Sequence, residues 1–332
     1  MENKKLISIV IPCYNEEKNI DKTIDEIIEV EKTLEKYKFE IIAVNDGSKD
    51  DTWKVIKKYS QKYDNVIGIN QMTNFGQSMA YQAGFDVSNG EYLITVSADL
   101  EIPLENLTKV IEKLEEGYDL VNTNRVGRWG GDDLSGEGKD RAMKSGYANR
   151  LIKKISGMDI QDRGSGMKGL TKPLYKNLKF YGEMHRFIPD YVSVYGAKII
   201  EFDVNYKERE YGESYYKGHK RTVKVLLDLT TLVFMLYFAR KPFNMMPGRL
   251  FGFTGAVMGA LGFFITSFLV LEKFVMGTDI GTRPLFLLGA LMMLLGIIMV
   301  MLGMLGELLM RTYFESTGRK PYMSREIARK SI

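Results

Sequence analysis

Two acidic residues, Asp99 and Glu101, stand two positions apart directly after a short apolar run. Carboxylate oxygens at this spacing can hold a divalent cation, and such a cation would bridge the phosphates of a pyrophosphate group. A solvated loop ahead of a helix that begins near Pro103 would have the same spacing. We therefore treat both acids as candidate metal ligands and keep the plain loop as the alternative.

Two further polar segments follow earlier apolar runs. A Pro-Cys-Tyr-Asn-Glu sequence occupies 12–16, and an Asn-Asp-Gly-Ser sequence occupies 45–48. Glycine lets a backbone turn close to a ligand, and Asp46 can accept hydrogen bonds from a base or a ribose. Turn chemistry with a helix cap also explains the second segment. Their occurrence at successive strand ends favours a binding site over two unrelated turns.

The elements that must position these segments alternate between short apolar runs and longer amphipathic stretches. The expected strands lie at 6–11, 39–44, 66–69, 92–96 and 120–123, and the expected helices at 17–37, 50–63, 77–86 and 103–116. This alternation predicts an α/β fold with a mainly parallel sheet that helices cover on both faces. Ligands of such sheets bind at the carboxyl ends of the strands, where the polar segments are expected. Residues 123–146 are rich in glycine and charge, and we expect a long mobile loop there, of the kind that is usually functional or disordered.

The last third of the chain has a different character. Residues 250–271 and 285–306 contain no charged side chain. At about 1.5 Å per residue each run extends about 33 Å, which is enough to cross a hydrocarbon core of about 30 Å. Two buried helices of a soluble domain are the alternative, but so small a domain could hardly enclose both. Glycines that would permit close packing of the two spans are Gly255, Gly259, Gly262, Gly289, Gly296 and Gly303.

Basic residues flank the two spans on their outer sides and predict the orientation of the chain. The loop between the spans has no basic excess. Positive flanks face the cytoplasm, so both termini and the α/β domain are expected there. Residues 223–239 are apolar but contain Lys224 and Asp228, which predicts an interfacial helix, with a third span as the alternative. The flanking basic residues are Arg240, Lys241, Arg249, Arg311, Arg319, Lys320, Arg325, Arg329 and Lys330.

Composition excludes several other classes of function. The net charge of +4 over 332 residues is too small to indicate a nucleic-acid-binding protein. One cysteine, Cys13, excludes an intrachain disulfide, and with two histidines it cannot form an ordinary structural zinc site. We expect Cys13 to be a small buried side chain and His185 and His219 to be structural or surface residues.

Four motifs in order, at 10–16, 45–48, 74–76 and 98–100, resemble those of inverting family 2 glycosyltransferases with the GT-A fold. Segments 162–166 and 209–216 and the two C-terminal spans resemble the branch that acts on polyprenyl phosphates. The resemblance implies a GT-A, Rossmann-like domain at 1–221, an interfacial helix and linker at 222–248, two transmembrane helices at 249–310, and a basic cytoplasmic tail at 311–332. It also implies transfer of one sugar from a UDP- or GDP-sugar to undecaprenyl or dolichyl phosphate at the cytoplasmic membrane face.

The resemblance also implies roles for individual residues. The nucleotide would be bound by Pro12, Tyr14, Glu16, Asp46, Ser97, Ala98 and Arg125. Mg²⁺ or Mn²⁺ would be bound by Asp99, with Glu101 as a second ligand. The lipid phosphate would be bound by Arg141, Ser145, Arg209 and Ser214, of which Arg141 and Arg209 would act in catalysis with Asp99. A surface ion pair with Glu208 or Glu210 is the alternative for Arg209.

Three residues depart from the family pattern. Ser97 and Glu101 replace an aspartate and a glutamine at the two ends of the acidic motif, and Tyr215 replaces a lysine. Lys217, His219 or Lys220 could supply the missing cation. Transfer to another membrane acceptor, such as diacylglycerol or a glycan, and a weakened scaffold or regulator therefore remain alternatives. The glycine-bearing spans also allow a homo-oligomer.

Overall fold

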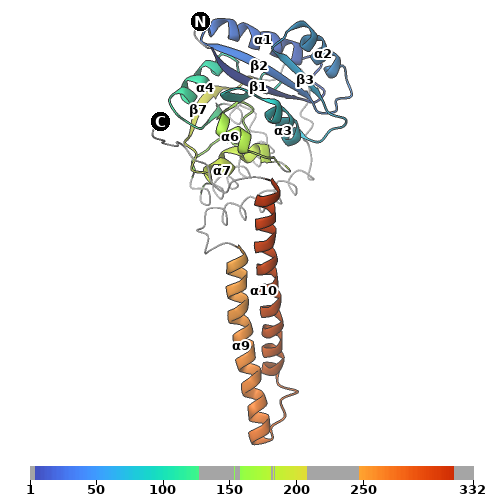
Figure 1. Cartoon of the computed structure of the whole chain (residues 1–332), viewed down its shortest axis with the longest axis vertical. Helices are drawn as coiled ribbons and strands as arrows, with labels where there is room; N and C mark the ends of the chain where they lie inside the picture. The colour runs from blue at the N-terminus through green and yellow to red at the C-terminus, as the bar shows by residue number, and fades with distance from the viewer. Residues whose placement is uncertain are drawn as a thin grey trace, which may run out of the picture. The chain divides into compact units, whose positions relative to one another are not determined.

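The first part of the chain is built on a twisted sheet with helices on both sides (Figure 1). The computed structural model describes residues 4–126, 153, 158–180, 182, 184–207 and 247–317. It divides into two compact units, Met1–Leu236 and Tyr237–Ile332. The interfacial helix expected over 223–239 and the proposed boundary at 221 lie outside the described residues.

Among the described residues the sheet has seven strands, in the order β3-β2-β1-β4-β6-β5-β7. Strands β1 to β4 form parallel pairs, as do β5 and β7, whereas β6 runs antiparallel to β4 and β5. The mainly parallel sheet predicted from the sequence is therefore confirmed. The strands are β1 (Lys5–Cys13), β2 (Tyr37–Asn45), β3 (Val66–Asn70), β4 (Tyr92–Thr95), β5 (Leu120–Val126), β6 (Lys168–Thr171) and β7 (Ile199–Asn205).

Alternate side chains of β1 face two different layers of helices. Ile9 and Ile11 belong to the core that includes Ile24 of α1 and Val110 of α4. Val10 faces the opposite layer, where Gly84 of α3 packs directly against its side chain. The helices are α1 (Ile20–Thr33), α2 (Thr52–Lys62), α3 (Gln77–Val87), α4 (Asn106–Glu115), α6 (Lys172–Asn177) and α7 (Ile188–Ser193), with a 3₁₀ turn η1 at Met184–Phe187. Burial on both faces explains why the central strands are almost continuously apolar.

Several boundaries differ from the sequence-based prediction. Helix α1 ends at Thr33 instead of 37, because Tyr37 pairs with Lys5 and extends β2. Helix α4 begins at Asn106, after a turn in which the Asn106 nitrogen donates to the Pro103 oxygen. Strand β5 continues to Val126, within the segment expected to be a loop, since it pairs with β7 along its whole length. Strands β6 and β7 were not predicted.

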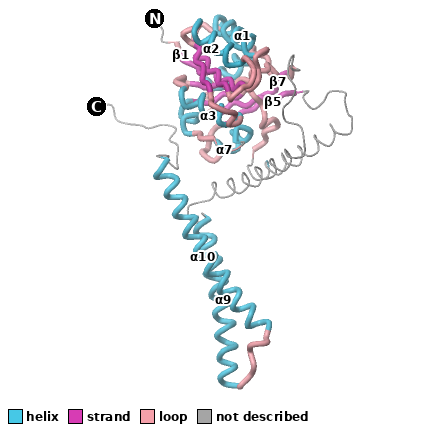
Figure 2. The backbone as a smooth tube through the Cα atoms, turned by 90° about the vertical axis from the view of Figure 1, so that its right-hand side faces the viewer, coloured by secondary structure: helices cyan, strands magenta, loops and turns pink. Residues whose placement is uncertain are grey.

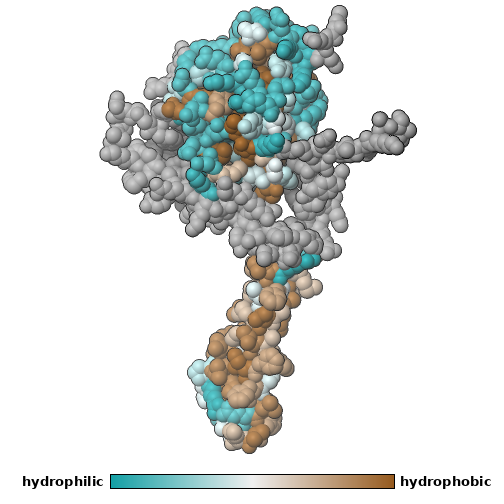
Figure 3. Space-filling view, turned by 90° about the vertical axis from the view of Figure 1, so that its left-hand side faces the viewer, coloured by the Kyte–Doolittle hydropathy of each residue, from teal (hydrophilic) through white to brown (hydrophobic). Residues whose placement is uncertain are grey.

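The second unit is an antiparallel pair of long apolar helices, α9 (Pro247–Met276) and α10 (Pro284–Thr317) (Figure 2). Among the described residues, two helices are long and apolar enough to cross a membrane: Gly248–Met276 with mean hydropathy 1.9 and Pro284–Leu309 with 2.8. Their visible surface is largely hydrophobic (Figure 3), and Phe253 is 71% exposed. So much exposed apolar surface does not suit buried helices of a soluble domain. Both expected spans are present as helices.

Glycine residues let the two helices touch backbone to backbone. A Cβ built on Gly296 would lie 2.5 Å from the Gly259 nitrogen, and one on Gly262 would lie 2.6 Å from the Gly289 oxygen. Real Cβ atoms do not approach so closely, so larger residues would force the helices apart. The close packing predicted from the glycine spacing is confirmed, and it is the arrangement by which small residues stabilise helix pairs in lipid.

Candidate functional site

The loops that follow β1 and β2 lie side by side at the carboxyl edge of the sheet. Cys13 and Asn45, the last residues of these strands, are paired in the parallel register. The Asn15 nitrogen donates to Oγ of Ser48 at 2.9 Å, and the Lys49 nitrogen donates to Oδ1 of Asn15 at 2.8 Å. Asn15 has a φ of 56°, a left-handed conformation that is uncommon outside glycine. The two polar segments singled out from the sequence thus form one structure.

Residues 12–16 present the predicted nucleotide-binding side chains at this edge. Pro12, Tyr14 and Glu16 are half-buried. The Glu16 nitrogen donates to Oγ1 of Thr52 at 2.8 Å, which ties this loop to the first turn of α2. Cys13 is fully buried, as expected, and burial raises the pKa of its thiol well above the ordinary value. Cys13 is therefore a small apolar side chain of the core.

Asp46 joins these loops to the start of α3. Its carboxylate accepts hydrogen bonds from the main-chain nitrogens of Phe75 at 2.8 Å and Gly76 at 3.0 Å. Burial raises the pKa of this carboxyl group, and the two N–H donors only partly oppose that effect. Gly47 has a φ of 65°, and a Cβ there would collide with the backbone of Thr73. Residues 45–48 and 74–76, which are distant in sequence, are therefore neighbours.

The loop after β4 carries the two acids. Ala98 is buried, and its oxygen accepts a 2.8 Å hydrogen bond from Oγ1 of Thr23 in α1. Asp99 is half-buried, and the Glu101 nitrogen lies 3.4 Å from its Oδ1 atom. Leu100 between them has a φ of 52°. The helical layer and the unusual backbone together hold Asp99 at the carboxyl edge of β4.

Glu101 is buried in an ion pair with Arg125. Its Oε2 lies 2.6 Å from Nη1 of Arg125, and Asp162 binds the same guanidinium with Oδ2 at 2.6 Å from Nε and Oδ1 at 3.0 Å from Nη2. Burial alone would lower the pKa of Arg125, but Asp162 and Glu101 reverse this and leave it raised. The two predicted site residues Glu101 and Arg125 therefore contact each other, and Glu101 is also the neighbour of Asp99 in the acidic loop.

Segment 162–166 packs beneath the acidic loop. Gly166 lies directly against Ser97, and a Cβ built on Gly166 would overlap the Ser97 hydroxyl. The Ser165 hydroxyl lies 2.5 Å from that of Thr123 in β5. Arg163 forms a second buried ion pair, with Nε 2.9 Å from Oδ2 of Asp190 in α7. Within this segment, which the sequence linked to the site through motif resemblance alone, Gly166 packs against the start of the acidic loop, whereas Arg163 pairs with α7.

Two buried polar side chains, those of Lys168 and His185, were not among the site residues predicted from the sequence. Lys168 of β6 is 2% exposed and donates a hydrogen bond to the Ser165 oxygen; burial lowers its pKa to about 7. The sequence signal that could have indicated its burial is the position of this lysine within a short run of glycine and apolar residues. His185 is buried with Nδ1 2.8 Å from Oγ of Ser78, which agrees with the structural role expected for it.

The donor set suits a cation that is shared with a bound diphosphate. Within the described part of the chain, no three His, Cys, Asp or Glu side chains gather as a complete metal site. Asp99, with Glu101 beside it, could supply one or two hard oxygen ligands, and phosphate oxygens and water would supply the others. Mg²⁺ is commonly bound in this way, through one or two carboxylates and the phosphates of a substrate.

Four predicted site residues, Arg141, Ser145, Arg209 and Ser214, lie outside the described residues. Lys207, at the end of the described segment, donates from its nitrogen to the Glu101 oxygen at 2.9 Å. Lys207 is thus held against the acidic loop.

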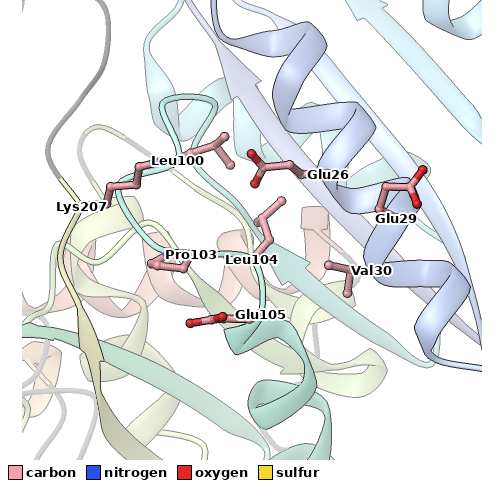
Figure 4. Close-up of a pocket in the computed structure, with 8 residues that line it drawn as sticks. All are labelled: Glu26, Glu29, Val30, Leu100, Pro103, Leu104, Glu105 and Lys207. Carbon is pink, nitrogen blue, oxygen red and sulfur yellow. The ribbon is translucent and has the colours of Figure 1, made fainter.

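A cavity of about 310 Å³ lies between α1, the loop before α4 and Lys207 (Figure 4). Its charged lining consists of three carboxylates and one ammonium, above an apolar floor that includes Leu104. An anionic diphosphate would be repelled by that lining. The cavity is thus not the nucleotide site, although Leu100 belongs to both the cavity wall and the acidic loop. The charged lining residues are Glu26, Glu29, Glu105 and Lys207.

Comparison with known proteins identifies relatives along nearly the whole chain. The sequence profile of glycosyl transferase family 2 matches residues 8–178. A dodecaprenyl-phosphate galacturonate synthase from Rhizobium johnstonii is 33% identical over 97% of this chain and 92% of that protein. An undecaprenyl-phosphate 4-deoxy-4-formamido-L-arabinose transferase from Proteus mirabilis is 30% identical over 97% of this chain and 93% of that protein.

Solved structures with low sequence identity share the fold. Mannosyl-3-phosphoglycerate synthase from Rubrobacter xylanophilus aligns with a TM-score of 0.51 and 17% identity, over 74% of this chain and 76% of that one. Glucosyl-3-phosphoglycerate synthase from Mycobacterium tuberculosis, solved with UDP, aligns with a TM-score of 0.50 and 18% identity, over 70% of this chain and 80% of that one. The GT-A fold expected from the sequence is confirmed.

Proposed function

This chain belongs to glycosyl transferase family 2, and from that premise we propose that it transfers a sugar from a nucleotide-sugar to a polyprenyl phosphate. The observation that carries the proposal is the extent of the similarity to the Rhizobium johnstonii and Proteus mirabilis proteins, which covers 97% of the chain in each case. Both of those proteins are named for sugar transfer to a polyprenyl phosphate. The α/β domain and both apolar helices therefore belong to the compared region.

The strand-end loops would bind the donor. Tyr14, Glu16 and Asp46 surround the place where β1 and β2 end, so we assign them to the base and ribose, together with Pro12. Ser97 and Ala98 would lie along the nucleotide, and Asp99 would bind Mg²⁺ or Mn²⁺. That cation would supply neutralisation of the negative charge on the departing diphosphate. Asp99 is the acid best placed for this role because Glu101 is engaged by Arg125.

The acceptor would act as the nucleophile without a strong base. A phosphate monoester has a second pKa near 6, so a polyprenyl phosphate is largely a dianion at neutral pH. One of its oxygens would attack the anomeric carbon while the bond from that carbon to the diphosphate breaks, and the nucleoside diphosphate leaves. Direct displacement inverts the anomeric centre. We assign Arg141 and Arg209 to the acceptor phosphate, with Ser145 and Ser214, because guanidinium forks match phosphate geometry.

The two apolar helices would keep the enzyme at the bilayer that holds its acceptor. A polyprenyl tail does not leave the lipid, so the reacting phosphate stays at the membrane surface. We infer from the basic flanks that both termini and the α/β domain are cytoplasmic. Within the chain we propose a catalytic domain at 1–221 and a membrane region at 249–310.

The test is transfer by the full-length protein in nanodiscs that contain a polyprenyl phosphate. UDP- and GDP-sugars are supplied one at a time with Mn²⁺, and the lipid product is identified by mass. We expect one donor to give a glycosyl phosphate polyprenol, EDTA to abolish its formation, and Asp99→Asn to reduce the rate about 100-fold or more, since changing only a partner behind a metal ligand already costs about 10- to 100-fold. A product formed only on diacylglycerol, or no transfer from any donor, would exclude the proposed acceptor.

A further inference from the structure

The guanidinium of Arg125 donates hydrogen bonds to two protein carboxylates. Nε and Nη2 donate to Asp162, and Nη1 donates to Glu101, at 2.6, 3.0 and 2.6 Å. The side chain is 3% exposed. A guanidinium that bound a phosphate directly would have to give up part of this arrangement, which would leave a buried carboxylate without its counter-charge at considerable cost.

The two carboxylates come from separate segments, and one of them belongs to the acidic loop. Glu101 follows Asp99 by two residues, and its nitrogen lies 3.4 Å from Oδ1 of Asp99. Its oxygen accepts a hydrogen bond of 2.9 Å from the nitrogen of Lys207. The position of Glu101 therefore affects both the acid proposed to bind the metal and the segment that begins after β7.

Asp162, the other partner of Arg125, is itself firmly placed. Its nitrogen donates to Oε1 of Glu201 in β7 at 3.1 Å, and its oxygen accepts from Nδ2 of Asn122 in β5 at 3.0 Å. Asn122 also donates to Glu201 at 2.6 Å. Arg125 thus connects a rigid part of the sheet, through Asp162, to the acidic loop, through Glu101.

We propose that Arg125 is a positioning residue: it fixes Glu101, and through Glu101 the loop that carries Asp99, and it does not contact the phosphates of the donor. The inference rests on the proposed function, because it takes Asp99 as the place of the metal. It replaces the direct contact with the nucleotide that the family resemblance implied for Arg125. Groups that orient metal ligands from behind commonly affect metal affinity 10- to 100-fold.

Arg125→Lys is the informative variant. A lysine keeps the positive charge but cannot form the planar fork that spans two carboxylates. We expect the full-length variant in nanodiscs to bind Mn²⁺ alone about 10-fold more weakly, measured from the electron paramagnetic resonance signal of unbound Mn²⁺. Its affinity for UDP or GDP in EDTA, measured by calorimetry with whichever nucleotide the wild type binds, should change less than about two-fold.

Arg163→Lys is the matched control. Arg163 is also a buried arginine paired with an aspartate, but its partner Asp190 lies in α7 and not in the acidic loop. The Mn²⁺ affinity of the Arg163→Lys variant should equal that of the wild type. If Arg125→Lys proves unstable in a thermal melt, Asp162→Asn removes the charge behind Arg125 while keeping a similar shape, and it should also weaken Mn²⁺ binding.

The results separate the inference from the function on which it rests. Unchanged Mn²⁺ affinity in Arg125→Lys, or a fall in nucleotide affinity in EDTA as large as the fall in Mn²⁺ affinity, would overturn the positioning role. Asp99→Asn reports on the metal site itself. If Asp99→Asn binds Mn²⁺ as the wild type does, both the metal role of Asp99 and the inference fail, while the measurement of sugar transfer still judges the proposed reaction.

Discussion

The carboxylate of Asp46, directly after β2, accepts a hydrogen bond of 2.8 Å from the main-chain nitrogen of Phe75, two residues before α3. A side chain chosen from its sequence motif as a nucleotide ligand is thus also a structural link between two loops. Both loops border the proposed base-binding region. The geometry of that region should therefore depend on the charge and shape of residue 46.

Asp46→Asn should weaken donor binding more than acceptor binding. An amide offers one acceptor oxygen in place of two, so one of the two N–H donors loses its partner, at a cost of about 1–3 kcal/mol. We expect the KM for the nucleotide-sugar to rise about 10-fold, with the KM for the polyprenyl phosphate unchanged. Steady-state kinetics with each substrate varied in turn would check this, and an equal rise in both values would contradict it.

Gly296→Ala should loosen the hairpin of α9 and α10. A Cβ at this position would meet the Gly259 backbone, whereas a Cβ at Gly252 meets no atom within 4 Å. Alanine has the higher helix propensity at either site, by about 1 kcal/mol, so propensity cannot explain a difference between them. Thermal melts of the protein in detergent should show a lower Tm for Gly296→Ala and an unchanged or higher one for Gly252→Ala. Equal Tm values would refute the close contact.

Arg163→Met should destabilise the α/β domain. Asp190 is fully buried, and without Arg163 its carboxylate would keep its charge in the interior or take up a proton there. Removing one partner of a buried pair typically costs about 3–5 kcal/mol. We expect a clearly lower Tm, partly restored in the double variant Arg163→Met/Asp190→Leu, which removes the buried carboxylate as well. A double variant as unstable as the single one would argue against this account.

Lys168 should make stability depend on pH above neutrality. Burial lowers its pKa from 10.5 in the unfolded chain to about 7 in the folded one. Between these values the unfolded chain binds the extra proton, so the free energy of unfolding rises with pH, by up to about 1.4 kcal/mol per pH unit. Below pH 7 both states are protonated and this contribution is constant.

The check for Lys168 is a pair of Tm series between pH 6.5 and 8.5 for the wild type and Lys168→Met. Methionine cannot titrate, so the wild type should gain stability relative to the variant as the pH rises through this range. Parallel series would show that Lys168 keeps its proton in the folded protein. The comparison cancels the contribution of the other groups that titrate in the same interval.

The local pattern of apolar residues was enough to predict most of the sheet and both long helices. Strands β1 to β4 contain apolar runs and β5 begins with Leu-Val, and the helices α9 and α10 contain uncharged runs that only a membrane or a large core could cover. Strand β6 was missed because it has four residues, among them a lysine and a glycine. Its place between β4 and β5 depends on pairing with both, which no local pattern reports.

The sequence by itself determined that the polar segments at 12–16, 45–48 and 98–101 would meet, because parallel strands bring their carboxyl ends to one edge of a sheet. Only the tertiary structure decided which partners the charged groups would take. Glu101 and Arg125 are 24 residues apart and Arg125 and Asp162 are 37 apart. A buried charge is stabilised by whichever opposite charge the fold places beside it, and that choice follows from packing across the sheet.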